Sequence, residues 1–133
     1  MDCVLDACAM LAYLRAEAGG GIVAARLKDP HTTCLAHIVN IWEVYYVVLR
    51  ERGESDADAA LAALARDGLI IRRDMSSAFW KSVCNLKAVG GISMADCFCI
   101  NLAMAVDGEV LTTDRTEFDR VIHVGLCPIT YIR

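Results

Sequence analysis

The sequence predicts an α/β fold in which helices cover both faces of a parallel β-sheet of four to five strands. Short apolar runs bounded by turn residues alternate with longer runs whose apolar residues recur at helical spacing. Hydrophobic residues make up 56% of the chain and charged residues 23%, which excludes a disordered protein. The length of 133 residues predicts one domain, residues 1–133, with a substantial core.

Start and stop signals divide the chain into twelve expected elements. The strands cover residues 1–6, 32–36, 69–71, 109–113 and 128–132. The helices cover residues 7–17, 22–28, 38–51, about 55–67, about 76–89, 94–106 and 115–121. Ser55 and Asp58 have capping-box spacing, and Pro128 is tolerable if its strand lies at a sheet edge. The helix over 38–51 is apolar almost all round, which predicts burial on every side.

Three consecutive glycines, Gly19, Gly20 and Gly21, follow the first expected helix. They lack the G-x-x-x-x-G-K-[ST] pattern of a phosphate-binding loop. We therefore expect a flexible turn rather than an anion site.

The seven cysteines include no C-x-x-C pair, and the three histidines are far apart in the chain. This pattern favours reduced core thiols over zinc ligands or disulfides, as is usual in the cytoplasm. No apolar run approaches the ~18 residues of a membrane span, and the start of the chain is acidic and strand-like. We expect a cytoplasmic protein without a secretory signal or a membrane partner.

Four carboxylates occupy positions that a parallel sheet brings to one edge. Asp6 closes the first strand and Asp114 the fourth, whereas Asp96 lies in the first turn of the helix that precedes the fourth strand. Glu43 lies early in the helix that follows the second strand. Because strand ends and helix starts meet at the same rim, we expect the four side chains to converge.

Each carboxylate also has a purely structural interpretation. Asp6 is placed to cap its helix, and Asp96 and Asp114 each belong to a pair with capping-box spacing. Glu43 lies inside its helix among apolar residues, so a core ion pair with an arginine is the alternative there. Asn40 lies one turn earlier on the same face.

Crowded carboxylates repel one another and raise one another's pKa values unless a cation neutralises them. Oxygen ligands without a histidine or cysteine cluster favour Mg²⁺ or Mn²⁺, which suit phosphoryl chemistry. The net charge of −4 and the scattered basic residues count against a nucleic-acid partner. The four acids account for that whole charge, however, so the rest of the surface is neutral on balance.

Four segments carry a resemblance to a known family: VLDACAMLAYL (4–14), NIWEV (40–44), SMADCFCINLA (93–103) and VLTTDRTEF (110–118). In this order the chain resembles PIN-domain ribonucleases, specifically the VapC-like toxins of toxin–antitoxin pairs. The resemblance implies a three-layer α/β/α sandwich and metal-dependent RNA cleavage that leaves a 5′-phosphate and a 3′-hydroxyl. It also implies a homodimer and an antitoxin whose tail fills the catalytic groove.

By this resemblance, the metal-binding and catalytic acids are Asp6, Glu43, Asp96 and Asp114, supported by Asn40 and Thr112. Two positions depart from the family pattern. Cys8 stands where a serine or threonine is frequent, and His37 where a serine is frequent. Both departures bear on the rate and the metal preference, because neither removes a carboxylate.

The expected mechanism uses three aspartates as ligands of one Mg²⁺ or Mn²⁺, directly or through water. Glu43 either ligates the same ion or orients and deprotonates the attacking water. Four further charged residues have two interpretations each, as surface charges or as contacts to a second ion (Glu117, Asp119) or the RNA backbone (Arg115, Arg120).

Two other functions fit parts of the pattern. An Mg²⁺-dependent aspartyl phosphatase also places an aspartate at a strand end, but Asp6-Ala7-Cys8 lacks the second acid of a D-x-D motif. A non-catalytic PIN-like module that binds RNA or protein needs no acids, so the complete set argues against it.

Overall fold

Five strands, all parallel, form one sheet in the order β3-β2-β1-β4-β5. This computed structural model describes residues 1–133. The strands are β1 (Cys3–Leu5), β2 (Cys34–His37), β3 (Ile70–Arg72), β4 (Glu109–Thr112) and β5 (Ile129–Tyr131). The helices are α1 (Ala7–Leu14), α2 (Gly20–Lys28), α3 (Ile38–Arg52), α4 (Glu54–Arg66), α5 (Ser77–Val89), α6 (Met94–Ala105) and α7 (Arg115–Val124).

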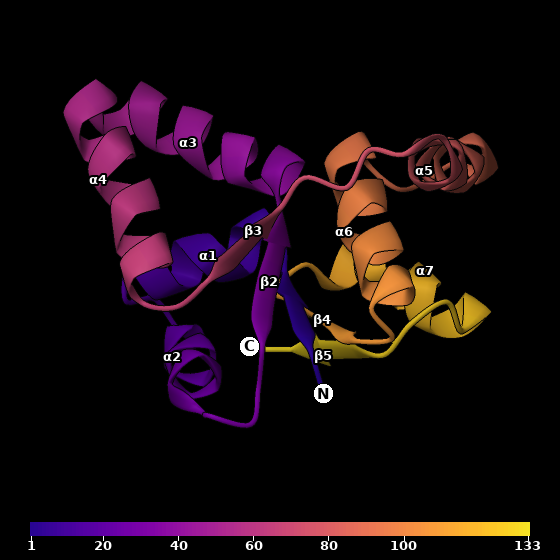
Figure 1. Cartoon of the computed structure of the whole chain (residues 1–133), viewed down its shortest axis with the longest axis horizontal. Coiled ribbons are helices and arrows are strands. Elements are labelled where there is room, and N and C mark those ends of the chain that lie inside the picture. Colours follow the sequence, from indigo (N-terminus) through magenta and orange to yellow (C-terminus); the bar gives the residue numbers. More distant parts are fainter.

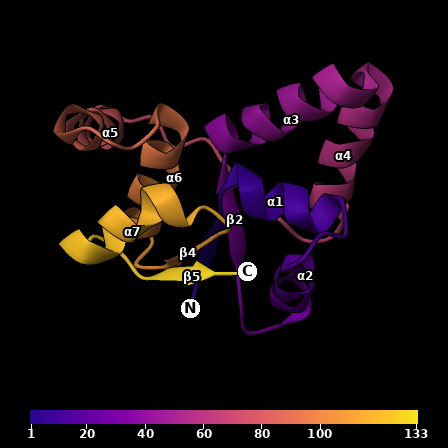
Figure 2. The same ribbon diagram turned by 180° about the vertical axis from the view of Figure 1, so that it is seen from behind.

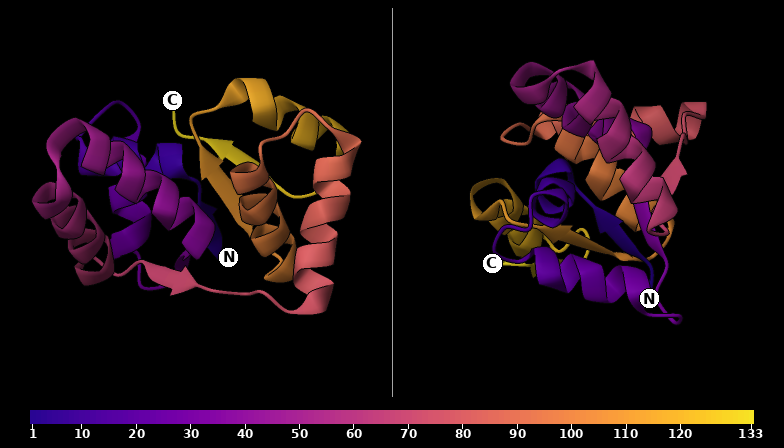
Figure 3. Two further views of the ribbon diagram at one scale, coloured as in Figure 1. Left: turned by 90° about the horizontal axis from the view of Figure 1, so that it is seen from above. Right: turned by 90° about the vertical axis from the view of Figure 1, so that its left-hand side faces the viewer.

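The helices form two layers because side chains alternate between the faces of each strand. Cys3 and Leu5 of β1 pack in one core cluster with residues of α1, α2, α3 and α4. Val4, between them, packs in a second cluster with residues of α5, α6 and α7. Figures 1 and 2 show the sheet between these two groups of helices, and Figure 3 shows the same division from above. The predicted three-layer sandwich is confirmed.

The carboxyl ends of three strands lead directly into helices. Asp6 caps α1 after β1, His37 caps α3 after β2, and Asp114 caps α7 after β4. Helix α6 runs toward the amino end of β4, so its own start at Ser93 returns to the rim where the strands end. This rim carries the candidate site.

The prediction of a flexible turn at the three glycines is wrong for two of them. Only Gly19 turns the chain, with a φ of 91°, and Gly20 and Gly21 form the first turn of α2. A Cβ atom on Gly20 would lie 2.5 Å from the carbonyl oxygen of Ala12. Gly20 therefore allows α2 to approach α1 closely.

The expected cap at Ser55 is also wrong. Helix α4 begins at Glu54, and Gly53 occupies the cap position without a side-chain hydrogen bond. The φ of 95° at Gly53 is a conformation that glycine adopts without strain. The chain therefore enters α4 two residues earlier than the capping pattern predicts, at Gly53 instead of Ser55.

Helix α3 is not buried all round. Ile41, Val44 and Val48 pack in the core, whereas Trp42 and Tyr46 are 58% and 49% exposed. The core needs one face of the helix, and no other element covers the opposite face, so its aromatic residues meet solvent. None of the seven helices is both long enough and apolar enough to cross a bilayer.

Candidate metal centre

Asp6 is the most buried acid at the rim, with 1% of its surface exposed. Its Oδ1 accepts a hydrogen bond from the backbone N–H of Ala9 at 2.8 Å, which caps α1. Its Oδ2 accepts the hydroxyl proton of Thr112 at 2.5 Å. Burial raises the pKa of Asp6 to about 7, and the charges of Glu43 and Asp114 add to the rise. Capping therefore uses one oxygen only and leaves the second directed toward β4.

Thr112 ties two of the expected acids together. While its hydroxyl donates to Asp6, the same oxygen accepts the backbone N–H of Asp114 at 2.9 Å. Asp114 in turn caps α7, because its Oδ1 accepts the backbone N–H of Glu117 at 3.1 Å. The hydroxyl expected in a supporting position thus sets the distance between the end of β1 and the start of α7.

Asp96 does not cap its helix, because Ser93 does. The Ser93 hydroxyl accepts the backbone N–H of Asp96 at 3.2 Å, so the Asp96 carboxyl has no capping role. This carboxyl is 8% exposed and forms a tight group with those of Asp114 and Glu117, whose ligand oxygens lie within 4.8 Å of one another. Burial raises the pKa of Asp96, and the neighbouring Glu117 carboxylate raises that pKa further.

Glu117 joins this group although the sequence favoured a solvated acid on the helix surface. Its carboxylate accepts the backbone N–H of Ser93, which holds α7 against the start of α6. The neighbouring Asp96 carboxyl is the main reason that the pKa of Glu117 is lowered. Its position in the first turn of a helix that starts at the same rim is the feature of the sequence that could have indicated this contact.

Glu43 is half-buried on α3, and none of the four ion pairs in the structure includes it. The arginine partner considered for it is therefore absent. Burial raises the pKa of Glu43, and the charge of Glu117 adds to the rise. Asp6 and Glu43 lie outside the tight group of three, but the charge of Glu43 contributes to the raised pKa of Asp6. The charge that acts on Glu43 is therefore that of another carboxylate, and no arginine or lysine pairs with it.

Asn40 lies one turn before Glu43 and is fully buried. Its Nδ2 donates to the carbonyl oxygen of Ala95 at 3.3 Å, which links α3 to α6. Its Oδ1 is the one buried side-chain oxygen or nitrogen atom without a hydrogen-bond partner. A buried amide oxygen without a donor is an open position for a water molecule or a hydrated ion.

The residues at the rim fit a hard divalent cation. Carboxylate oxygens of Asp96, Asp114 and Glu117 lie close enough to share one ion, and the second oxygen of Asp6 faces the same rim. The pKa values of Asp6 and Asp96 are raised, as expected for buried carboxyl groups that lack a neutralising charge. All of these donors are oxygens, the preference of Mg²⁺ and Mn²⁺.

The remaining charged residues near α7 have partners elsewhere. The Asp119 carboxylate accepts the Tyr131 hydroxyl at 2.5 Å, so it does not join the group. The Arg115 guanidinium lies 4.3 Å from the centre of the Tyr131 ring and donates to the carbonyl oxygen of Arg133. Arg120 donates to the carbonyl oxygen of Gly90.

The two departures from the family pattern have different surroundings. His37 replaces a serine as a cap, because its Nδ1 accepts the backbone N–H of Val39 at 3.2 Å. Its ring is fully buried and stacks on Phe79 with centroids 5.4 Å apart. Cys8 lies in the first turn of α1 with its side chain partly open to solvent, and partial desolvation and the Asp6 charge raise the pKa of its thiol to about 11.

Comparison with known proteins agrees with this fold. Residues 3–123 match the PIN domain family. The chain is similar in structure to VapBC2 from Rickettsia felis, solved with a DNA fragment from its promoter (TM-score 0.74, 14% identity, 98% of each chain covered). It is similar to VapBC-1 from nontypeable Haemophilus influenzae (TM-score 0.71, 14% identity, covering 99% of this chain and 98% of that one).

A third similar structure is VapC20 from Mycobacterium tuberculosis, described as a toxin that cleaves the sarcin–ricin loop (TM-score 0.70, 14% identity, covering 90% of this chain and 94% of that one). No curated protein matched the sequence. The family match extends over most of the chain, from the first residue of β1 into α7. This protein belongs to the PIN domain family.

Proposed function

We propose that the protein is a divalent-metal-dependent endoribonuclease, the toxin of a toxin–antitoxin pair. One observation carries the proposal: carboxylates from the end of β1, the end of β4 and the start of α6 reach a common rim, where the pKa values of Asp6 and Asp96 are raised. Helix capping alone does not require carboxyl groups to lie close together, where they repel one another. The PIN family match and the VapC-type structural neighbours support the same function.

Asp6, Asp96 and Asp114 would hold the ion, with Glu117 beside them. A bound Mg²⁺ or Mn²⁺ supplies charge neutralisation and polarises the scissile phosphate and the attacking water. Thr112 keeps Asp6 and Asp114 at a set separation, so these ligands need little rearrangement when the ion binds.

Glu43 is the group that accepts the proton of the attacking water. It lies on α3, outside the tight group of three, and its raised pKa makes its carboxylate a stronger base than a solvated glutamate. Water then attacks the phosphorus, the P–O3′ bond breaks in line, and the leaving 3′-oxygen takes a proton from solvent, which produces a 5′-phosphate and a 3′-hydroxyl. Asn40, with its free Oδ1 one turn away, would orient a water molecule beside Glu43.

The substrate is tested with purified protein, labelled RNA and MgCl₂ or MnCl₂. We expect cleavage that EDTA abolishes, and products that carry a 5′-phosphate. Asp96→Asn should abolish cleavage and retain the fold. Asp107→Asn is the matched control: this acid is exposed before β4 and has a φ of 53°, which asparagine adopts readily. Full cleavage by the Asp96→Asn protein would reject the assignment.

The same preparation separates the rival functions. A non-catalytic module would leave RNA intact in every metal, and an aspartyl phosphatase would hydrolyse p-nitrophenyl phosphate without cutting RNA. Calorimetric titration with Mn²⁺ adds an independent readout, because the acid group should bind the ion and Asp96→Asn should weaken that binding.

The partner would be an antitoxin that binds beside the acids. A groove of about 520 Å³ opens next to Glu43 and is lined also by Val39, Trp42, Tyr46, Met94 and Ala95. Its exposed apolar residues suit the apolar side of a peptide, and the adjacent carboxylates suit a lysine or arginine on that peptide. Structural neighbours described as VapBC complexes support such a partner.

Binding of an antitoxin is tested by co-expression of the chain with the products of the genes that flank its own gene. A complex should form and cleavage should stop, and Trp42→Ala should weaken the complex without reducing Mn²⁺ binding. Light scattering on the chain alone tests the expected homodimer, and activity in the cytoplasmic fraction tests the expected location.

A further inference from the structure

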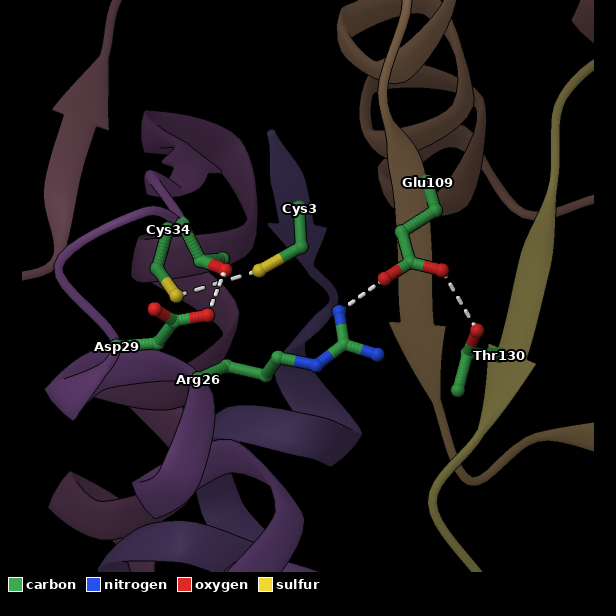
Figure 4. Close-up of polar contacts among 7 residues, drawn as sticks. Cys3, Arg26, Asp29, Cys34, Glu109 and Thr130 are labelled. Atoms are coloured by element: carbon green, nitrogen blue, oxygen red, sulfur yellow. Dashed lines mark hydrogen bonds and ion pairs between the residues drawn. The ribbon is translucent and has the colours of Figure 1, made fainter. Parts of the chain in front are cut away.

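Two cysteines face each other at the amino ends of β1 and β2, at the opposite end of the sheet from the acids. Cys3 begins β1 and Cys34 begins β2, and the two residues are direct partners in the parallel pairing of these strands. Their sulfur atoms lie 3.2 Å apart, and Figure 4 shows the side chains pointing toward each other. Both belong to the core cluster on the α1–α4 face of the sheet.

The surroundings of this pair carry charge. Figure 4 shows the Arg26 side chain passing beneath the two strands to an ion pair with Glu109 of β4. Glu109 also accepts the Thr130 hydroxyl at 2.7 Å, so the arginine is held from the far side. Asp29 is nearby but accepts from the hydroxyl of Thr32 and the backbone N–H of His31. The Arg26 guanidinium is therefore the positively charged group beside the two cysteines.

A hydrogen bond joins the two thiols, and either sulfur can be its donor. Burial acts to raise the pKa of both thiols, and the positive charge of Arg26 acts in the opposite direction on both. Cys34 keeps 3% of its surface exposed and Cys3 none, so Cys34 is the sulfur that an oxidant reaches first and the nucleophile of the pair.

We propose that Cys3 and Cys34 form an oxidation site, in which a peroxide converts the two thiols into a disulfide that joins β1 to β2. The Cys34 thiolate attacks one peroxide oxygen, the O–O bond breaks, and the departing hydroxide takes a proton to become water. The Cys3 thiol then attacks the Cys34 sulfenic acid, the S–S bond forms, and a second water leaves with the Cys3 proton. Two thiols lose two electrons and the peroxide gains them.

The backbone already suits this bond. Neighbouring strands lie ~4.7–4.9 Å apart, within the ~4.4–6.8 Å between Cα atoms that disulfides span. The sulfur atoms must approach from 3.2 Å to about 2.05 Å, which side-chain rotation at two strand ends provides. The closed loop would join residues 31 positions apart.

The other cysteines provide the contrast. Cys8 and Cys84 are exposed, and Cys97, Cys99 and Cys127 are buried on the α5–α7 side of the sheet. The test therefore uses Cys8→Ser/Cys84→Ser protein, which removes the exposed thiols. In this background Cys3 is the single cysteine of tryptic peptide 1–15, and Cys34 that of peptide 29–50.

Folded protein is treated with hydrogen peroxide, its free thiols are alkylated, and it is digested without reductant. We expect a loss of about 2 Da from the intact mass and a linked pair of peptides, 1–15 with 29–50, that dithiothreitol separates. The oxidised protein should unfold at a Tm at least about 5 °C higher, and dithiothreitol should reverse the shift. Cys3→Ala should abolish the linked pair and the shift, whereas Cys127→Ala should change neither.

Three results would overturn the proposal. The first is alkylated Cys3 and Cys34 after peroxide at concentrations that leave the fold intact. The second is a link from Cys34 to any other cysteine. The third is a lower Tm after cross-linking, because a bond made only in unfolded chains would strain the native sheet. If Cys3→Ala protein does not fold, Cys34→Ser serves the same purpose. None of these readouts depends on the proposed nuclease activity.

Discussion

The Thr112 hydroxyl donates to Asp6 across 2.5 Å, although 106 positions of chain separate the two residues. The same oxygen accepts the backbone N–H of Asp114. One side chain thereby joins the end of β1 to the end of β4, two neighbouring strands in the centre of the sheet. The pairing of these strands decides where the acids meet.

Thr112→Val should therefore lower the free energy of unfolding by about 1–3 kcal/mol, because it leaves a buried carboxyl oxygen and a backbone N–H without partners. Thr112→Ser retains the hydroxyl and should lose less. Urea denaturation measures both variants. Equal midpoints for Thr112→Val and the unaltered protein would show that this hydrogen bond contributes nothing to stability.

Asp6 predicts a pH dependence of the metal-free protein. Its pKa rises from 3.8 to about 7 on folding, so between these values the native state keeps a proton that the unfolded chain has released. Stability from this group is complete below pH 3.8 and is lost as pH rises toward 7, with a slope of at most about 1.4 kcal/mol per pH unit. Asp6→Asn should remove that slope, measured by urea denaturation between pH 4 and pH 8.

The Asn side chain retains an acceptor for the Ala9 N–H, so the variant should fold. Addition of Mg²⁺ should raise the Tm of the unaltered protein more at pH 8 than at pH 5, because the ion binds ionised carboxylates. A Tm of the Asp6→Asn protein that falls across the same range as steeply as that of the unaltered protein would contradict the assignment of this slope.

His37 predicts a dependence of the opposite sign. Burial lowers its pKa below 6.5, and a protonated ring could not accept the Val39 N–H that caps α3. Its contribution is therefore complete above pH 6.5 and is lost as pH falls through the lower, native pKa. The loss is at most about 1.4 kcal/mol per pH unit.

Because Asp6 acts in the same range, this effect is measured in the Asp6→Asn background. His37→Asn keeps a capping acceptor and should flatten the acid side of the stability curve, at a constant cost from the lost stacking on Phe79. A His37 ring that titrates above pH 6.5 by NMR would be incompatible with this account.

Glu117 should contribute to metal affinity. Glu117→Gln removes one charge from the group it forms with Asp96 and Asp114, and we expect a Kd for Mn²⁺ about 10–100-fold weaker. Asp119→Asn is the matched control on the same helix, because Asp119 pairs with Tyr131 instead. Calorimetry that finds the two variants equal would exclude Glu117 from the site.

The order of elements and the class of fold could be predicted from the sequence, because each signal is local. Strand-like runs, helical spacing and the caps at Asp6, Ser93 and Asp114 depend on residues a few positions apart. The expected cap at Ser55 was wrong, because Gly53, with its positive φ, occupies the cap position instead. Local patterns also placed the acids at strand ends and helix starts, which a parallel sheet gathers on one rim.

What the sequence by itself determined is thus the order of the strands and helices and which acids stand at their ends. Only the tertiary structure decided that Glu117 joins Asp96, that α3 leaves Trp42 exposed, and that Cys3 meets Cys34. The reason is physical: a helical or strand pattern records which residues share one face. The neighbour that this face meets depends on the order of strands in the sheet and on the packing of helices distant in sequence.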